Sequence, residues 1–337
     1  ELQTKLKKAG GWLDDDVCSA RLIYVNDVFQ PELSKATDSI RNLESTEGLS
    51  DEIVKFLGRL TDGWTDELQV DVPVQEGEPL TSFQKLSGPN HNVGAPDTQF
   101  AINSQQGTAC FAALNTMKCR SMALLHAKTS MDKPVLIVHA YTQDGGVDAT
   151  KAGVALHPRT VIVADDDAAV SVVQQSISLD STDDDVRPIF MNSYTQVLLG
   201  KNSNVTHCRL EESGGLPTSG VEQSDADLRN KENERPAMQN TILETLDVHC
   251  AGESAHYGGT VLSLGGNGRV RMCASIALLR PGSSVDLKGF SLNGGNCRHD
   301  IKTNIQHIAD GCTSAQIQKN LVSGRATTSF RGRVRVE

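Results

Sequence analysis

The stretch Val270-Arg-Met-Cys-Ala-Ser-Ile-Ala-Leu278 places an apolar side chain at every second position. The final stretch, Phe330-Arg-Gly-Arg-Val-Arg-Val336, also alternates with a period of two. A period of two is typical of a β-strand, because successive side chains of a strand point to opposite faces. No segment of ten or more residues between Thr241 and Glu337 has a convincing helical period. The sequence therefore predicts that this part of the chain consists of short strands.

Small polar corners separate these strands. Gly282, Gly311 and Gly324 each begin such a corner, and successive corners lie about 13 to 16 residues apart, or about twice that. One turn of such a chain cannot close a hydrophobic core, whereas stacked turns can. Aromatic residues are only 4% of the chain, which suits a narrow interior. We therefore predict a right-handed parallel β-helix, a mainly β solenoid.

The N-terminal part has a different pattern, and we expect two regions in the chain, the second of which contains a long loop. Residues 1–120 are predicted to form a mixed α/β segment with a few short helices, and residues 121–337 the β-helix. Residues 50–60 predict a helix with Ser50 as its N-cap, and residues 100–117 predict a second helix. The charged, Gly- and Ser-rich residues 212–236 are predicted to be a disordered loop.

Charge and cysteine usage narrow the functional classes. The net charge of -10 argues against a nucleic-acid-binding protein, which needs a basic face. The four arginines near the end of the chain are interpreted as a solvated sheet face rather than a phosphate site; they are Arg325, Arg331, Arg333 and Arg335. The eight cysteines are scattered without a C-x-x-C pair, which favours a reducing compartment. No apolar run is long enough to span a membrane.

The motifs that could support chemistry are weak. Residues 265–268 are Gly-rich, but a strand rather than a helix is predicted after them, so they indicate a corner and not a phosphate cradle. Three Asp triplets lack the spacing of a calcium loop. The close His/Cys pairs, His307 with Cys312 and His249 with Cys250, each supply only two metal ligands, so packing roles are favoured for them. The residues alone thus predict an intracellular β-helical scaffold with no active site of its own.

Four segments together resemble one known family. They are Leu22-Ile-Tyr-Val-Asn-Asp-Val-Phe-Gln-Pro-Glu-Leu-Ser34, Phe111-Ala-Ala-Leu-Asn115, His157-Pro-Arg-Thr-Val-Ile-Val163, and the block Ile305–Lys319 with Phe330–Val336. The last block resembles the succession His, Cys-x-Ser-x-Gln-x-x-Lys and Phe-x-Gly-x-Ile/Val-x-Val of the SufB/SufD family. That family comprises the β-helical scaffold subunits of an iron–sulfur cluster assembly complex. The matching positions here are His307, Cys312, Ser314, Gln316, Lys319, Phe330 and Gly332.

The resemblance implies a role and partners. The chain looks more like SufD than SufB, because a cysteine-bearing N-terminal region typical of SufB has no counterpart. It implies a non-enzymatic scaffold that pairs with a SufB-like subunit through the β-helix and acts with a SufC-like ATPase in iron acquisition or nascent cluster formation. No cofactor would be bound tightly by this chain alone, and iron or an Fe–S cluster would be present transiently in the complex. His307 and Cys312 are the candidate metal ligands. The C-terminal helical region of the family is expected to be absent from this chain.

Other functions remain open at this stage. A carbohydrate-active, pectate-lyase-like β-helix enzyme would need acidic and basic residues lined up on consecutive turns, and a purely structural solenoid would need no partner. The chain could also form a homodimer through exposed strand edges. The plastid stroma is the suspected location, with the bacterial cytoplasm as the alternative.

Overall fold

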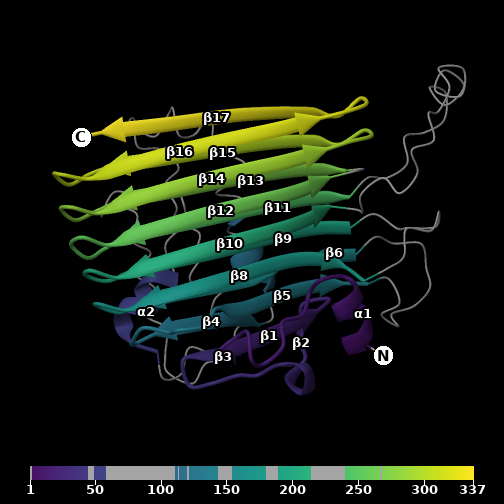
Figure 1. Ribbon diagram of the computed structural model, residues 1–337, viewed down its shortest axis with the longest axis horizontal. Helices are drawn as coiled ribbons and strands as arrows, with labels where there is room; N and C mark the ends of the chain where they lie inside the picture. Colours follow the sequence, from purple (N-terminus) through teal and green to yellow (C-terminus); the bar gives the residue numbers. More distant parts are fainter. Residues whose placement is uncertain are drawn as a thin grey trace, which may run out of the picture.

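The computed structural model describes residues 2–44, 49–57, 111–112, 114–119, 121–142, 154–179, 189–213, 240–265 and 268–337. Within these residues the chain is mainly β, with two sheets of mostly parallel strands lying face to face (Figure 1). From β7 to β17 the chain alternates between the two sheets, strand by strand. This coiling confirms the predicted parallel β-helix-like fold.

Sheet A has eight strands, and all neighbours in it are parallel except β1 and β2. In spatial order they are β16 (Thr313–Val322), β14 (Ser284–Asn293), β12 (His256–Gly265), β10 (Asn204–Ser213), β8 (Ala169–Ser178), β5 (Val135–Tyr141), β1 (Ala20–Val25) and β2 (Val28–Phe29).

Sheet B has nine strands, with β3 antiparallel to β4 and the remaining neighbours parallel. They are β17 (Thr327–Val336), β15 (Arg298–His307), β13 (Arg269–Leu278), β11 (Thr241–Cys250), β9 (Ile189–Leu199), β7 (Arg159–Ala164), β4 (Met122–Ala127) and β3 (Ile40–Leu43), with β6 (Val154–Leu156) also paired to β9. Strands β1 and β3 belong to the N-terminal segment, so that segment contributes to both sheets.

The register between turns is regular at the C-terminal end. Tyr257 pairs with Val285, and Val285 pairs with Ser314, so one turn takes 28 or 29 residues. The corner that leads from sheet B to sheet A needs a left-handed backbone in each of these turns, with φ of +55° at Ser254, +73° at Gly282 and +66° at Gly311. Glycine is suited to this position because it has no Cβ. Gly282 and Gly311 therefore occupy corner positions at which the backbone conformation favours glycine.

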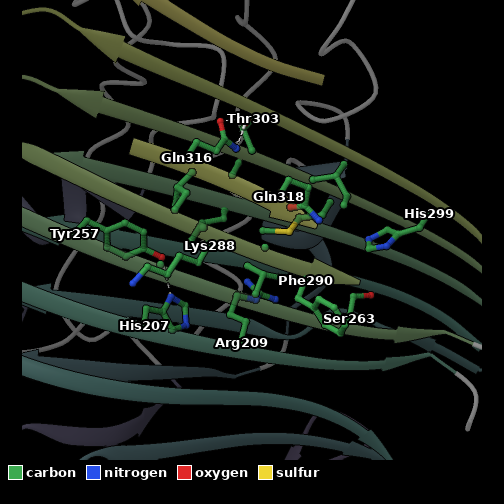
Figure 2. Close-up of a pocket in the computed structure, with 18 residues that line it drawn as sticks. His207, Arg209, Tyr257, Ser263, Lys288, Phe290, His299, Thr303, Gln316 and Gln318 are labelled. Atoms are coloured by element: carbon green, nitrogen blue, oxygen red, sulfur yellow. Dashed lines mark hydrogen bonds between the residues drawn. The ribbon is translucent and has the colours of Figure 1, made fainter. Parts of the chain in front are cut away.

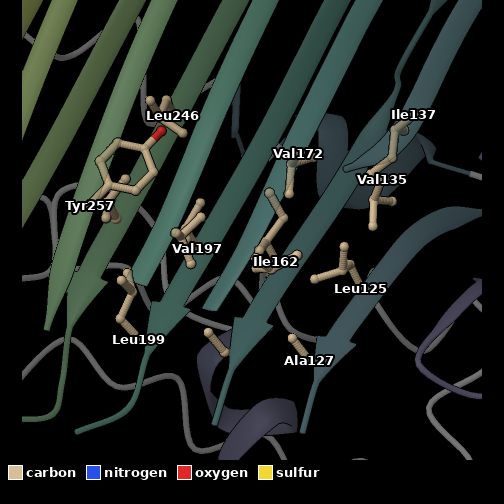
Figure 3. Packing of buried hydrophobic residues seen from close by; sticks show 14 of the residues in the cluster. Leu125, Ala127, Val135, Ile137, Ile162, Val172, Val197, Leu199, Leu246 and Tyr257 are labelled. Atoms are coloured by element: carbon tan, nitrogen blue, oxygen red, sulfur yellow. The ribbon is translucent and has the colours of Figure 1, made fainter. Parts of the chain in front are cut away.

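The main core lies between the sheets. Inward side chains such as Leu125, Ile162, Val197 and Leu246 form one buried cluster (Figure 3). Full burial of such a side chain contributes about 1.5–3 kcal/mol. A second cluster lies on the outer face of sheet B beneath the helix α2 (Asp51–Leu57), and a third on the outer face of sheet A beside α1 (Leu2–Lys8).

The few helices agree with the sequence where the structure describes them. In α2 the Ser50 hydroxyl accepts a hydrogen bond from the Ile53 amide at 3.4 Å, as expected of an N-cap, while residues 58–60 lie outside the described residues. Residues 111–112 and 114–118 are helical, and a short 3-10 helix spans Pro31–Leu33. The remainder of the predicted helix over 100–117 lies outside the described residues.

The buried Arg159 joins these helices to sheet B. Its guanidinium donates to the Thr116 hydroxyl at 2.8 Å, to the Leu57 carbonyl at 3.3 Å and to Gln196. One side chain of β7 thus holds both α2 and the segment around residue 116 against the outer face of the sheet.

The predicted loop over 212–236 begins too early. Strand β10 continues to Ser213, because Glu212 and Ser213 pair with Leu264 and Gly265 of β12. The other residues of that predicted loop lie outside the described part of the chain. The described part continues at residue 240, and β11 begins at Thr241.

Candidate functional site

The last turn of the β-helix, formed by β16 and β17, is the most exposed apolar surface of the described residues. Large apolar side chains that are strongly exposed concentrate there, and they are Ile317, Leu321, Val322, Phe330, Val334 and Val336. Among the described strands, none pairs with the outer edge of β16 or β17. Unpaired strand edges with apolar side chains are typical docking surfaces. The last turn is therefore a candidate site for binding another protein.

The two candidate metal ligands lie near the start of this turn, but their contacts are those of packed residues. The His307 Nε2 atom lies 2.9 Å from the Ser314 hydroxyl, and the Cys312 thiol donates to the Arg280 carbonyl at 3.4 Å. Within the described part of the chain, no group of three or more His, Cys, Asp or Glu side chains could hold a metal ion. Metal binding by His307 and Cys312 remains a prediction from the resemblance.

The other matching positions fall on β16 and β17. Ser314 and Gln316 lie on the inward side of β16, and the Gln316 amide donates to the Thr303 hydroxyl at 2.8 Å. Lys319 points outward and is exposed. Phe330 and Gly332 are on the inward side of β17, where a Cβ on Gly332 would meet the Phe330 ring at 3.1 Å and the Gln316 Oε1 atom at 3.3 Å. The structure thus brings Gln316, Phe330 and Gly332 together at the open end of the interior.

A small cavity lies just inside this end (Figure 2). Its volume is about 30 Å³, and its lining includes His207, Arg209, His299, Thr303 and Gln316. A cavity of this size holds only one or a few water molecules. Its lining connects a residue of the family-like motif, Gln316, with polar residues buried deeper in the β-helix.

Those polar residues form a band inside the molecule, between the main core cluster and a smaller apolar cluster around Met191 and Ile242. His207 contacts the Tyr257 hydroxyl at 3.0 Å and the Gln174 side-chain carbonyl at 3.1 Å. Gln174 donates in turn to Thr195 at 3.1 Å. Buried polar groups need such partners, because an unsatisfied one is costly in a low dielectric.

A buried ion pair lies at the centre of the band. Arg209 of β10 and Glu244 of β11 each have only 3% of the side chain exposed, and the guanidinium donates to the carboxylate. Arg209 also donates to Thr195 at 3.0 Å. Glu211 lies on the same inward face, where burial first and the charge of Glu244 second raise its pKa well above the usual range. Burial and the neighbouring charge thus favour the protonated form of Glu211, and the Glu244 carboxylate makes the ion pair with Arg209.

Three histidines that point into the β-helix are neutral. Burial, assisted by the positive charge of Arg209, lowers the pKa of His139 and of His207 to about 3. Burial lowers the pKa of His299 to about 4, against the opposing charges of Glu244 and Asp300. None of these three histidines carries charge at neutral pH. The band thus supplies neutral hydrogen-bonding groups and one compensated ion pair.

The sequence pattern did not predict this polar band. His207, Arg209 and Glu211 occupy alternate positions of β10 and therefore lie on the same face as the buried Val205. The available signal was a charged residue at a strand position where the alternation of the sequence calls for an apolar side chain. It could not identify Glu244 as the partner, because the two side chains meet across the interior from different sheets, 35 residues apart in the chain.

A model of the protein family described as "SUF system FeS cluster assembly, SufBD core domain" matches residues 147–337, which is more than half of the chain. The chain belongs to the SufB/SufD family. The SufBD core domain thus includes the strands from β6 to β17, with both the polar band around Arg209 and the exposed last turn. Membership assigns the chain to iron–sulfur cluster assembly by the SUF system. The sequence matches no curated protein.

Among the described residues, no helix has the length and apolar character required to cross a bilayer.

Proposed function

We propose that this chain is a SufD-type scaffold subunit of a SUF iron–sulfur cluster assembly complex. It pairs with a SufB-type subunit through the last turn of the β-helix and acts beside a SufC-type ATPase. Iron, or the nascent Fe–S cluster, is the cargo of the assembled complex. The chain itself has no active site and binds no resident cofactor. The plastid stroma or the bacterial cytoplasm would supply the reducing conditions that its scattered cysteines favour.

The exposed apolar last turn is the observation that supports pairing. Val334 is 54% exposed and Val336 is 73% exposed, although both lie on the inner side of sheet B. Val334 pairs with Ile305 of β15, the neighbouring strand of the sheet. In β15 the equivalent Ile305 is completely buried by the turns on either side. A partner β-strand docked on β17 would bury these side chains in the same way.

The polar band supports a scaffold rather than an enzyme. Its ion pair is internally compensated, and its histidines are neutral and buried, so none of these groups is presented to a substrate from solution. Buried ion pairs contribute little net stability but can favour one specific packing of the core. We assign the band to fixing the geometry of the turns on which the docking surface is built.

The test is co-expression of the tagged chain with its cognate SufB-type and SufC-type subunits, followed by purification and a cluster assembly assay. We expect a stoichiometric complex, and loss of cluster assembly when this chain is omitted. The variant Val334→Lys should weaken the complex by tenfold or more, because a charge would be buried at the docked edge. Val28→Lys is the matched control, since Val28 is 52% exposed and belongs to β2, which lies at the opposite end of the molecule from β17 (Figure 1).

Two results would contradict the proposal. A complex that tolerates Val334→Lys as well as Val28→Lys would exclude the last turn as the docking surface. A folded chain that ignores both partners but cleaves a polysaccharide would support the carbohydrate-active alternative instead.

A further inference from the structure

The outward face of β17 is strongly basic. Arg331, Arg333 and Arg335 are all exposed and follow one another at alternate positions, about 7 Å apart along the strand. They point away from the interior, because they pair in register with the outward residues of β15, whereas their neighbours Phe330 and Val334 pair with the inward Ile301 and Ile305.

The basic character continues over the two preceding strands of sheet B. Arg269 and Arg271 of β13, and Arg298 and Lys302 of β15, share this outward face, and Arg269 lies directly opposite Arg298. Only two carboxylates accompany these seven cations at the outward positions of β13, β15 and β17 and at the residue that follows β17. Asp300 lies 3.1 Å from Arg271 and 3.9 Å from Lys302, and Glu337 lies 3.2 Å from Arg335. This face has an excess of positive charge on a chain whose net charge is -10.

Such a face disfavours pairing with a second copy of the same chain. A two-fold dimer that continued both sheets would pair β17 with β17 of the second copy in an antiparallel way, with the same outward face on both strands. We consider antiparallel registers that keep Phe330 and Val334 on the inner side and overlap near the centre of β17. Each of these registers places an arginine of one copy opposite, or diagonal to, an arginine of the other copy. Like charges placed directly opposite each other in a sheet are destabilising.

The same geometry favours a different partner. An edge strand with Asp or Glu at its outward positions would place carboxylates opposite the three arginines, which are exposed and in a fixed register. Cross-strand pairs of opposite charge stabilise a sheet, and repulsion against the wrong partner adds specificity.

We propose that Arg331, Arg333 and Arg335 make the edge of β17 selective for a partner subunit with an acidic edge strand, and that they reject a second copy of this chain. This inference rests on the proposed pairing through the last turn. It adds the chemistry of the partner and the residues that choose it.

A charge-exchange experiment tests the selection. The triple variant Arg331→Glu, Arg333→Glu, Arg335→Glu is prepared, its fold is checked by circular dichroism, and sedimentation equilibrium is measured for each protein alone and for their equimolar mixture. We expect the mixture to form a 1:1 dimer at least about tenfold tighter than either protein alone, and this gain to shrink in high salt. The control variant Lys8→Glu, Lys128→Glu, Lys133→Glu makes the same change in net charge with exposed lysines far from β17, and its mixture with the unchanged chain should show no gain.

A second arm separates this inference from the proposed function. The cognate SufB-type subunit should bind the unchanged chain about tenfold or more tightly than the triple Arg variant. If it binds both equally, or if the unchanged chain dimerises as tightly as the charge-exchanged mixture, selection by these arginines is wrong while pairing through the last turn can stand. If it binds neither, the proposed function fails and the inference fails with it.

Discussion

At the residue scale, the buried Arg209–Glu244 pair is the most sensitive point of the interior. Both side chains are almost completely buried, and each is the charge that compensates the other. Removal of one partner of such a pair leaves a buried charge without compensation, which commonly costs about 3–5 kcal/mol. Glu211 lies beside them, and its raised pKa favours the protonated form; it makes the two losses unequal, because it can ionise in place of Glu244.

We predict that Arg209→Met lowers the free energy of unfolding by about 3–5 kcal/mol, and that Glu244→Gln lowers it by less. The reason is that Glu211 can release its proton and balance Arg209 once Glu244 is neutral. Urea denaturation measures both changes. The exposed pair Arg271–Asp300 provides the control, since Arg271→Met should cost at most about 1 kcal/mol. Equal losses of unfolding free energy for Arg209→Met and Arg271→Met would contradict the expected cost of leaving a buried charge without its partner.

The buried histidines predict a loss of stability in acid. Because the pKa of His207 is about 3 in the folded chain and near 6.5 when unfolded, the unfolded chain binds the proton more readily between these values. The stabilising effect is complete above pH 6.5 and is lost as the pH falls, at about 1.4 kcal/mol per pH unit for each such histidine. Glu211 acts in the opposite direction, since its raised pKa stabilises the fold at low pH and this contribution is lost as the pH rises.

The variant His207→Gln isolates one histidine, because Glu211 is present in both proteins. Between pH 6 and 4 the free energy of unfolding of the variant should fall less steeply than that of the unchanged chain, by about 1.4 kcal/mol per pH unit. Equilibrium denaturation at a series of pH values gives both slopes. Identical slopes would mean that His207 takes up a proton in the folded chain at the same pH as in the unfolded chain, so that its pKa is not lowered by folding.

At the element scale, the corners between strands control how each turn closes. Ser254, Gly282 and Gly311 all have a left-handed backbone at the same corner of successive turns. A Cβ on Gly311 would have space, with only the Gly282 amide nitrogen at 3.9 Å. The cost of a side chain at Gly311 is therefore conformational and not steric.

We predict that Gly311→Ala destabilises the fold by about 1–2 kcal/mol. The converse change, Ser254→Gly, should be neutral or stabilising by up to about 1 kcal/mol, since it relieves the same backbone cost. Thermal denaturation of both variants provides the comparison. A loss of stability in Ser254→Gly larger than that in Gly311→Ala would show that the backbone angle does not limit this corner.

These corners and strands also show what the sequence could and could not predict. The alternation around Val270 predicted its strand, because the inward face of that strand is buried. The same period of two around Phe330 predicted β17, although its apolar face is exposed. Ser50 predicted the start of α2 because capping is local. The Arg209–Glu244 contact and the joining of β1 and β3 to the sheets were not predictable, because each depends on which turn stacks on which. Gln316 was identified only by resemblance, and its position at the cavity follows from the same stacking.

At the scale of the whole molecule, stability should decrease toward the last turn. Each turn is held by its neighbours above and below, and within the described residues β16 and β17 have a neighbour on one side only. Stacked repeats of this kind have stabilities that add up from each turn and its nearest interfaces, and they open from the ends.

We predict that the backbone amides of β16 and β17 exchange with solvent before those of β9 and β11, which are paired on both sides. Hydrogen exchange followed by mass spectrometry measures this order. Addition of the SufB-type partner should then slow exchange in β16 and β17 while β9 and β11 stay unchanged. Uniform exchange along the β-helix would contradict the stepwise stability, and an unchanged rate in β17 upon binding would place the partner elsewhere.

The constant register from β12 to β16 has a consequence for the size of the subunit. Because each of these turns adds 28 or 29 residues and one strand spacing of about 4.8 Å, the distance from the helix-covered base to the docking end can change only in whole increments. Duplication or deletion of one complete turn would lengthen or shorten the molecule by one increment while preserving the sequence of its docking edge. The reach of the subunit can therefore evolve separately from its choice of partner.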